Sequence, residues 1–285
     1  MFESIVSYLY SIDTTWIAVL FSLFFISFSI LALFLMQLTI PHHQRREHND
    51  IVGFVYAVIG VIYAVLIGAV AIGSWDNFKK ASEVVIRENS AAANIYKLSN
   101  NFNKSDQEKI GEAMFSYMKL VIEEEWPQMQ AGILPTTGGW APLNNLISTL
   151  NTFKVETRKD SALYSELVSQ LDQLNNIRRE RIFMSGESIH PSLYLMIIMG
   201  AFICIVGCLL FGGIQPFSHL PITILLSFMI GLLLSTIFAL DRPFRGGLAI
   251  SAHPFELTYH LLQETKGKYW TSTCLARLNA KIYLS

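Results

Sequence analysis

Charged side chains are scarce in this chain, and the scarcity is local. They make up 15 % of its 285 residues, against about 25 % in an average soluble domain. Asp, Glu, Lys and Arg are all absent from three runs, Thr14–Pro41, Ile51–Ser74 and Ile189–Leu240. Helices that are apolar on every side belong in a large protein core or in a membrane. The composition therefore argues against an ordinary soluble domain.

The lengths of these runs suit membrane-spanning helices, since roughly 20 apolar helical residues cross a hydrocarbon core. The first two runs fit one span each, and the third fits two, divided near Gly212–Pro216 and Pro221. We expect spans near Trp16–Leu38, Ile51–Gly73, Leu193–Phe211 and Ile222–Leu240. The predicted fold is an all-α integral membrane protein with four transmembrane helices in two hairpins. Its parts are a first hairpin (1–75), a cytoplasmic helical segment (76–190), a second hairpin (191–241) and a cytoplasmic tail (242–285).

Basic residues are missing before the first run. Residues 1–13 contain Glu3 and Asp13 but no Lys or Arg. A signal peptide starts with basic residues and carries a shorter apolar stretch of about 7–15 residues. The first run is therefore predicted to be a retained span.

Lys and Arg are also rare in the two predicted hairpin turns, which hold only Arg45 and Arg46 between them. The opposite side carries Lys79, Lys80, Arg87, Arg178, Arg179, Arg181, Arg242 and Arg245. The positive-inside rule then places the termini and the middle segment in the cytoplasm. The first span taken alone favours the reverse orientation, since Lys and Arg are absent before it and Arg45 and Arg46 follow it. We follow the larger number of basic residues on the opposite side. The predicted location is the plasma membrane, which is the inner membrane if the source is bacterial.

Residues 76–190 lack the alternating pattern of strands and are predicted to be helical. The apolar stripe formed by Val84, Val85, Ala92, Ile95 and Leu98 extends the second span beyond the membrane. Ser105–Glu108 has capping-box spacing, and Pro127 is predicted to end the helix that follows. Further helices are expected around Leu143–Leu150 and Leu163–Ile177, and a tail helix at Pro254–Glu264.

Motifs for catalysis and for cofactor binding are absent. The sequence has no Gly-rich phosphate loop, no Gly-x-Ser-x-Gly and no His-Glu-x-x-His, which are typical of nucleotide-binding and hydrolytic enzymes. The net charge of −1 argues against a broad nucleic-acid surface. We predict no enzyme, no cofactor and no nucleic-acid partner.

Possible metal ligands and cysteines are given structural interpretations. Glu123, Glu124 and Glu125 could suit a hard cation, but consecutive helical residues point in different directions, so a solvated helix end is predicted. His42, His43 and His48 lack the partners of a zinc site and are expected in an interfacial loop. Cys204 and Cys208 on the third span, and Cys274 in the tail, are expected to be packing residues.

The second span carries the strongest pattern. Small residues recur every three or four positions and share one face: Gly53, Ala57, Gly60, Ala64 and Gly68. Such residues let helix backbones approach closely, either within a hairpin or around a symmetry axis. In the second case a pore would run along an adjacent face with Val52, Tyr56, Ile59, Tyr63 and Leu66. The fourth span has Thr223, Ser227, Gly231 and Ser235 at four-residue spacing, which we interpret as helix packing.

The spans have no charged residue near their middles, which counts against proton relays, ion-coupled transport and voltage sensing. A passive channel and a membrane scaffold both remain compatible. After the fourth span, Leu240–Gly247 either anchors the helix end or forms a fixed turn in which Asp241 pairs with a basic residue or with backbone N–H groups.

Several motifs together resemble the bestrophin-like family of prokaryotic membrane proteins. They are Arg46-Glu47-His48-Asn49-Asp50-Ile51-Val52-Gly53 leading into Gly60–Leu66, Trp75 followed by a helix with Glu88, Glu125-Trp126-Pro127 with Met129 and Gly132, and Leu240-Asp241-Arg242-Pro243-Phe244 with Gly246. The resemblance implies four spans, cytoplasmic termini and a cytoplasmic helical segment.

A more distant similarity to true bestrophin channels implies a homopentamer with the second span lining an ion pore. The chain has no acidic run after the fourth span like the calcium-binding clasp of bestrophins, so calcium gating is not implied. The predicted function is a passive oligomeric ion channel in the lipid bilayer. The alternative is a membrane scaffold whose cytoplasmic helices bind a protein partner.

Overall fold

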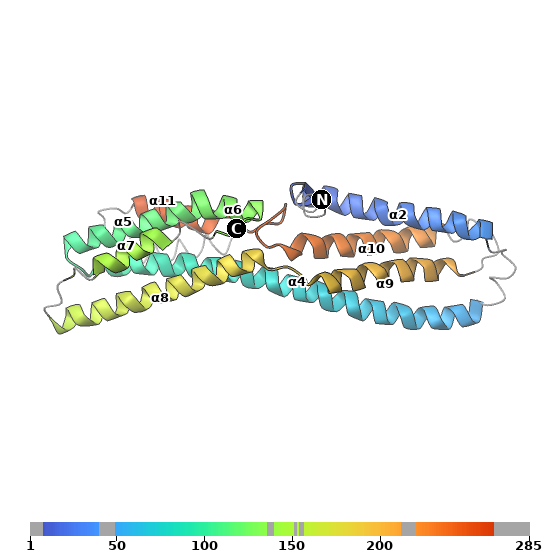
Figure 1. Cartoon of the computed structure of the whole chain (residues 1–285), viewed down its shortest axis with the longest axis horizontal. Coiled ribbons are helices and arrows are strands. Elements are labelled where there is room, and N and C mark those ends of the chain that lie inside the picture. The colour runs from blue at the N-terminus through green and yellow to red at the C-terminus, as the bar shows by residue number, and fades with distance from the viewer. Residues whose placement is uncertain are drawn as a thin grey trace. The chain divides into compact units, whose positions relative to one another are not determined.

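The computed structural model describes residues 8–39, 49–135, 140–150, 153, 157–211 and 220–264. These residues form helices and turns, and no strand occurs within those ranges. The chain divides into two compact units, whose helices are labelled in Figure 1. Unit 1 comprises Met1–Phe78, Ser188–Arg242 and Gly246–Leu248, and unit 2 comprises Lys79–Glu187, Pro243–Arg245 and Ala249–Ser285.

Unit 1 contains the apolar helices. They are α2 (Thr14–Thr39), the first part of α4 (Asn49–Ser99), α9 (Pro191–Leu209) and α10 (Leu220–Asp241). All four helices are long and apolar enough to cross a membrane, as predicted. The predicted continuation of the second span is also confirmed, because α4 runs without a break to Ser99. The third span begins and ends slightly earlier than predicted, with Pro191 at its first turn.

Small residues of α10 pack against α2, which lies beside it (Figure 1). Thr223, Ser227 and Ser235 are buried. A Cβ atom on Gly231 would lie 2.6 Å from the Cα of Ser22, so only glycine permits this approach of the two backbones. The packing interpretation of this stripe is confirmed, since small side chains are what allow such close contact. Cys204 and Cys208 of α9 are also buried, while Cys274 and the three histidines at 42, 43 and 48 lie outside the described residues.

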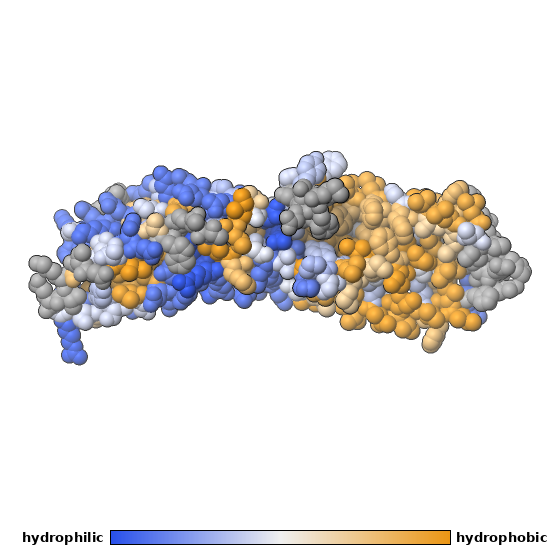
Figure 2. Space-filling view, in the orientation of Figure 1, coloured by the Kyte–Doolittle hydropathy of each residue, from blue (hydrophilic) through white to orange (hydrophobic). Residues whose placement is uncertain are grey.

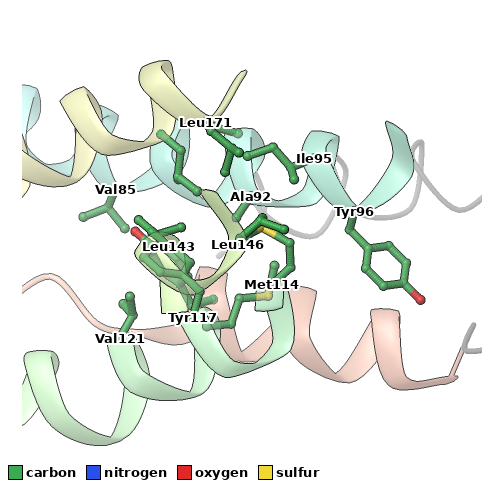
Figure 3. Close-up of a cluster of buried hydrophobic side chains, with 14 of the residues drawn as sticks. Val85, Ala92, Ile95, Tyr96, Met114, Tyr117, Val121, Leu143, Leu146 and Leu171 are labelled. Atoms are coloured by element: carbon green, nitrogen blue, oxygen red, sulfur yellow. The ribbon is translucent and has the colours of Figure 1, made fainter. Parts of the chain in front are cut away.

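Unit 2 is built from the second part of α4 and shorter helices around its own core. These are α5 (Lys104–Leu120), η1 (Val121–Glu125), α6 (Trp126–Ala131), α7 (Trp140–Leu150), α8 (Arg158–Gly186) and α11 (His253–Glu264). Figure 3 shows α4, α5, α7 and α8 side chains converging in this core, among them Val85, Tyr117, Leu143 and Leu171. The predicted helices around Leu143–Leu150, Leu163–Ile177 and Pro254–Glu264 are confirmed.

Two predictions about helix ends in unit 2 are wrong. The cap of α5 is Asn103, whose side chain accepts a hydrogen bond from the N–H of Asp106, rather than a box starting at Ser105. Pro127 does not end the helix. One π-helical turn, η1, precedes it and leads directly into α6. Proline lacks an N–H and crowds the carbonyl four residues earlier, and the wider turn accommodates both effects.

The end of α6 is fixed by a Schellman motif. Gly132 has φ 77°, its N–H donates to the carbonyl of Met129 at 2.9 Å, and the N–H of Ile133 donates to that of Gln128 at 2.8 Å. The left-handed conformation favours glycine. A Cβ here would also collide with the guanidinium of Arg245. Glycine is therefore favoured at position 132 by the backbone conformation, and a larger residue would also displace the Arg245 side chain.

Candidate pore helix and buried ion-pair network

Within unit 1, α4 uses one face for contacts with the rest of the chain, which we name the self-packed face. Tyr63, Ile67 and Val70 are buried there, and Ile59 and Leu66 pack beside them. Tyr56 and Tyr63 lie against two glycines of α9. A Cβ on Gly207 would come within 2.9 Å of Tyr56, and the Tyr63 ring fills the space beside Gly200. Tyr56, Ile59, Tyr63 and Leu66, which the sequence placed beside a possible pore, thus lie on the self-packed face, while Val52 is half-buried.

The stripe of small residues, the small-residue face, lies roughly a quarter-turn from the self-packed face, because successive helical residues are about 100° apart. Ala57 and Ala64 are exposed, and Gly60 and Gly68 are half-buried. A Cβ added to Gly60 or Gly68 would meet no atom within 4 Å. At Gly53 it would meet the ring of Phe211 at 3.6 Å. Most of this face is therefore left uncovered by the described part of the chain.

The face opposite the self-packed face carries large apolar side chains, and we name it the open apolar face. Its members are 50 % to 78 % exposed: Phe54, Val58, Val61, Val65 and Ile72. Figure 2 shows hydrophobic surface over much of unit 1. Only 11 % of the most apolar stretch of α4 is buried, against 28 % for α2, 33 % for α9 and 50 % for α10. Of the four apolar helices, α4 is the least covered by its own chain.

The described residues of the first two family motifs lie on α4. Asn49 is its first residue. Trp75 is 55 % exposed, and its ring stacks on Phe78 with centroids 6.3 Å apart. An exposed tryptophan at the end of an apolar stretch is typical of a membrane–water interface.

Asp241 is the last residue of α10, and it is buried. Its Oδ1 accepts a hydrogen bond from the N–H of Ile189 at 2.5 Å, just before α9 begins. Arg242 is 4.0 Å away and partly exposed. The carboxylate thus binds a backbone N–H that no helix satisfies, which is the fixed-turn arrangement of the two that the sequence left open.

Pro243 and Phe244 of the same motif lie in unit 2, where Phe244 meets the Glu125-Trp126-Pro127 motif. Phe244 is buried and packs edge-on against Trp126, with centroids 5.7 Å apart. The indole N–H of Trp126 donates to the carbonyl of Ile250 at 3.1 Å. Pro243 holds the same segment, since its carbonyl accepts from the N–H of Ile250 at 2.8 Å. Pro127 stands in the first turn of α6.

Four charged side chains, which we name the ion-pair network, are buried in unit 2. Arg181 binds Glu88 through two bonds, of 2.6 Å and 3.0 Å, and also donates to Glu125. Arg178 binds the other oxygen of Glu125 through bonds of 3.0 Å and 2.5 Å. The hydroxyl of Tyr117 donates to Glu88. Two carboxylates and two guanidiniums balance, so no net charge is buried.

The electrostatics favour the ionised forms of Glu125 and Arg181. Burial alone would raise the pKa of Glu125, but the charge of Arg181 and the bonds from Arg178 outweigh burial and hold the pKa below its usual value. Burial likewise opposes the charge of Arg181, yet Glu88 raises the pKa of this guanidinium above its ordinary value. Burial, together with the neighbouring Glu88, raises the pKa of Tyr117 well above normal, so its hydroxyl stays protonated. Arg181 also lies over the ring of Trp126, 5.5 Å from its centroid.

The network is the part of the site that sequence reasoning missed. The predicted solvated end at Glu125 is wrong, because its side chain is buried between Arg178 and Arg181. The sequence did contain a signal that Arg178 and Arg181 are buried. Arg178 and Arg181 continue the spacing of the buried stripe formed by Leu167, Leu171 and Leu174, and charges on an apolar face are rarely buried without partners. Within the described residues, no group of three His, Cys, Asp or Glu side chains could hold a metal.

Replacing Arg181 should destabilise unit 2 strongly. In Arg181→Met, two carboxylates lose their main partner inside the core, and breaking a buried pair costs about 3–5 kcal/mol. Arg87→Met is the matched control, since Arg87 binds Glu180 at 2.9 Å on an exposed surface, where a pair contributes about 0.2–1 kcal/mol. Amide hydrogen exchange of η1 and α8 measures both changes. Equal effects of the two substitutions would contradict the structural role of the network.

Comparison with known proteins agrees with this architecture. A solved structure of a bacterial bestrophin homologue from Klebsiella pneumoniae, in mutant form, is similar in fold, with a TM-score of 0.63 at 12 % identity over 88 % of this chain and 99 % of that one. A solved structure described only as a membrane protein matches with the same values. No curated protein matches the sequence. The model of the bestrophin-like domain matches residues 23–255, so the chain belongs to the bestrophin-like family.

Proposed function

We propose that this protein is a passive ion channel, assembled from several copies of the chain with α4 nearest the axis. One observation carries the proposal: α4 is the apolar helix least covered by its own chain. Family membership supports it, because the true bestrophins, to which the family is distantly similar, are channels. A count of five subunits follows from the same similarity.

The three faces of α4 are consistent with a ring of subunits. The self-packed face would point outward, toward α9 of the same copy, so the open apolar face on the opposite side would point toward the axis. Val61 and Val65 would then border the conduction path. A constriction of apolar side chains can close a pore by excluding water, which provides a gate without a charged residue in the membrane.

The flanks of α4 supply the contact between copies. One flank is the small-residue face around Gly60, and the other carries Val55 and Ile62, which are 51 % and 64 % exposed. Small residues on one helix receive large side chains of the next. Because the two flanks differ, the contact runs head to tail, and such contacts produce closed rings when the rotation closes.

The orientation completes the proposal. The charge distribution supports an orientation with both termini and unit 2 in the cytoplasm, and with α2–α4 and α9–α10 as two hairpins. In a bacterium the membrane would be the inner membrane. The scaffold function remains the alternative, and the state of assembly separates the two functions, since a stable monomer or dimer favours the scaffold.

Gly60→Leu should abolish assembly while leaving the single chain folded. No atom of the described chain lies near a Cβ at Gly60, so the added side chain obstructs only a neighbouring copy. Gly200→Leu is the matched control, because Tyr63 occupies that space within the same chain and the fold itself should suffer. Native mass spectrometry gives the subunit count, and circular dichroism gives the helix content. A fully assembled Gly60→Leu protein would contradict the proposed interface.

Val65→Ser should raise the current of the reconstituted channel several-fold. A hydroxyl in an apolar constriction lowers the cost of wetting it. Leu195→Ser on α9, at a side chain that is 62 % exposed, is the control that should change the current little, because α9 lies on the side of α4 away from the axis. Planar bilayer recordings with monovalent cations and anions measure both. Silence from a correctly assembled wild-type oligomer would rule out conduction, and equal effects of the two serines would place the axis elsewhere.

A further inference from the structure

Within the described residues, the large apolar side chains that unit 2 exposes are Ile147 of α7 and three others that lie near the ends of α6 and α8. Ile133 is 59 % exposed, Leu134 is 47 % exposed and Phe183 is 68 % exposed. We name these three the α6–α8 patch. Figure 2 shows that the surface of unit 2 on the face drawn is otherwise mostly hydrophilic. A single exposed apolar residue needs no explanation, whereas a group of them on a polar surface marks a site of interaction.

The three side chains are neighbours on a rigid base. Leu134 lies over Gly186, where a Cβ would meet its Cδ2 at 2.9 Å. Phe183 stands one turn before Gly186 on α8, so it shares that end of the helix. The Schellman bonds of Gly132 and Ile133 fix the backbone that precedes Leu134. The patch is therefore held open by ordered structure.

The course of the chain shows which end of unit 2 carries the patch. Only Glu187–His190 separate Gly186 from α9, a stretch that extends no more than about 18 Å. Gly132 lies against Arg245, which follows closely after the end of α10 at Asp241. Both sides of the patch are thus tied, within a few residues, to helices that are long and apolar enough to cross the membrane.

Basic side chains accompany the patch. Arg179, exposed, stands one turn before Phe183 on the same face of α8, and Arg245 lies beside Gly132. Aromatic and aliphatic side chains next to Arg suit the boundary between acyl chains and headgroups, and anionic lipids attract basic residues there.

We propose that the α6–α8 patch dips into the membrane surface beside the spans, with Arg179 on the lipid phosphates. The occupant is phospholipid, and the patch anchors unit 2 to the leaflet. The proposal goes beyond conduction. It requires that the apolar helices cross a membrane, but it holds whether or not the protein conducts.

Spin labels at two positions test the contact. In a background with Cys204, Cys208 and Cys274 replaced by alanine, Phe183→Cys and Asn176→Cys are labelled with a nitroxide. The protein is reconstituted in phosphatidylethanolamine vesicles that contain phosphatidylglycerol as the minor lipid. Asn176 is the matched control, since it is exposed on the same face of α8, two turns or about 10.5 Å farther from the membrane end. The readout is relaxation by oxygen, which concentrates in lipid, against relaxation by a nickel chelate, which stays in water.

The expected result is high oxygen and low nickel accessibility at position 183, with the reverse at position 176. High nickel accessibility at both positions would overturn the proposal, because the patch would face water. Low accessibility to both reagents at 183 would also overturn it, because protein rather than lipid would cover the patch. As a second measurement, Arg179→Gln should reduce the lipid signature at 183, and the reduction should be larger with phosphatidylglycerol than without it. Recordings on the same vesicles test conduction separately.

Discussion

Unit 2 depends on the pairing of Glu88 and Glu125 with Arg178 and Arg181. An isolated buried charge costs several kcal/mol, so each member of the ion-pair network is tolerable only while the others are in place. The four residues come from α4, η1 and α8. Their ion pairs therefore form only when these three helices are correctly packed. Apolar side chains alone would tolerate a small shift of one helix along another. Bidentate hydrogen bonds tolerate much less, because their geometry is specific.

Aromatic residues connect the ion-pair network with the segment that follows α10. Trp126 contacts Arg181 on its face, Phe244 at its edge and the carbonyl of Ile250 through its indole N–H. The π-helical turn η1 shifts the helix so that Glu125 and Trp126, adjacent in sequence, both lie in the core. The motifs around Trp126 and around Phe244 are therefore mainly structural. They hold the segments that lead into and out of the apolar helices.

The helices of unit 1 are held together by close packing at glycines instead of by buried ion pairs. Tyr56 and Tyr63 fasten α4 to α9 by filling the spaces beside glycines, while α2 and α10 pack closely through Gly231. This leaves most of the apolar stretch of α4 uncovered. Lipid can solvate such a surface, since it is as apolar as the side chains. Further copies of the chain can also cover it, and a channel would use that possibility.

The sequence by itself determined the membrane class, the four apolar helices and nearly every other helix, because charge-free runs of that length and apolar stripes of helical period have few alternatives. It also indicated the small-residue packing of α10. The tertiary structure alone decided that Glu125 is buried, that η1 carries the chain past Pro127, and which face of α4 is used within the chain. The partners of Glu125 and Glu88 lie 53 and 93 residues away in sequence. Local periodicity can mark Arg178 and Arg181 as members of a buried stripe, but it does not identify their partners, since charge pairs form only when distant helices meet.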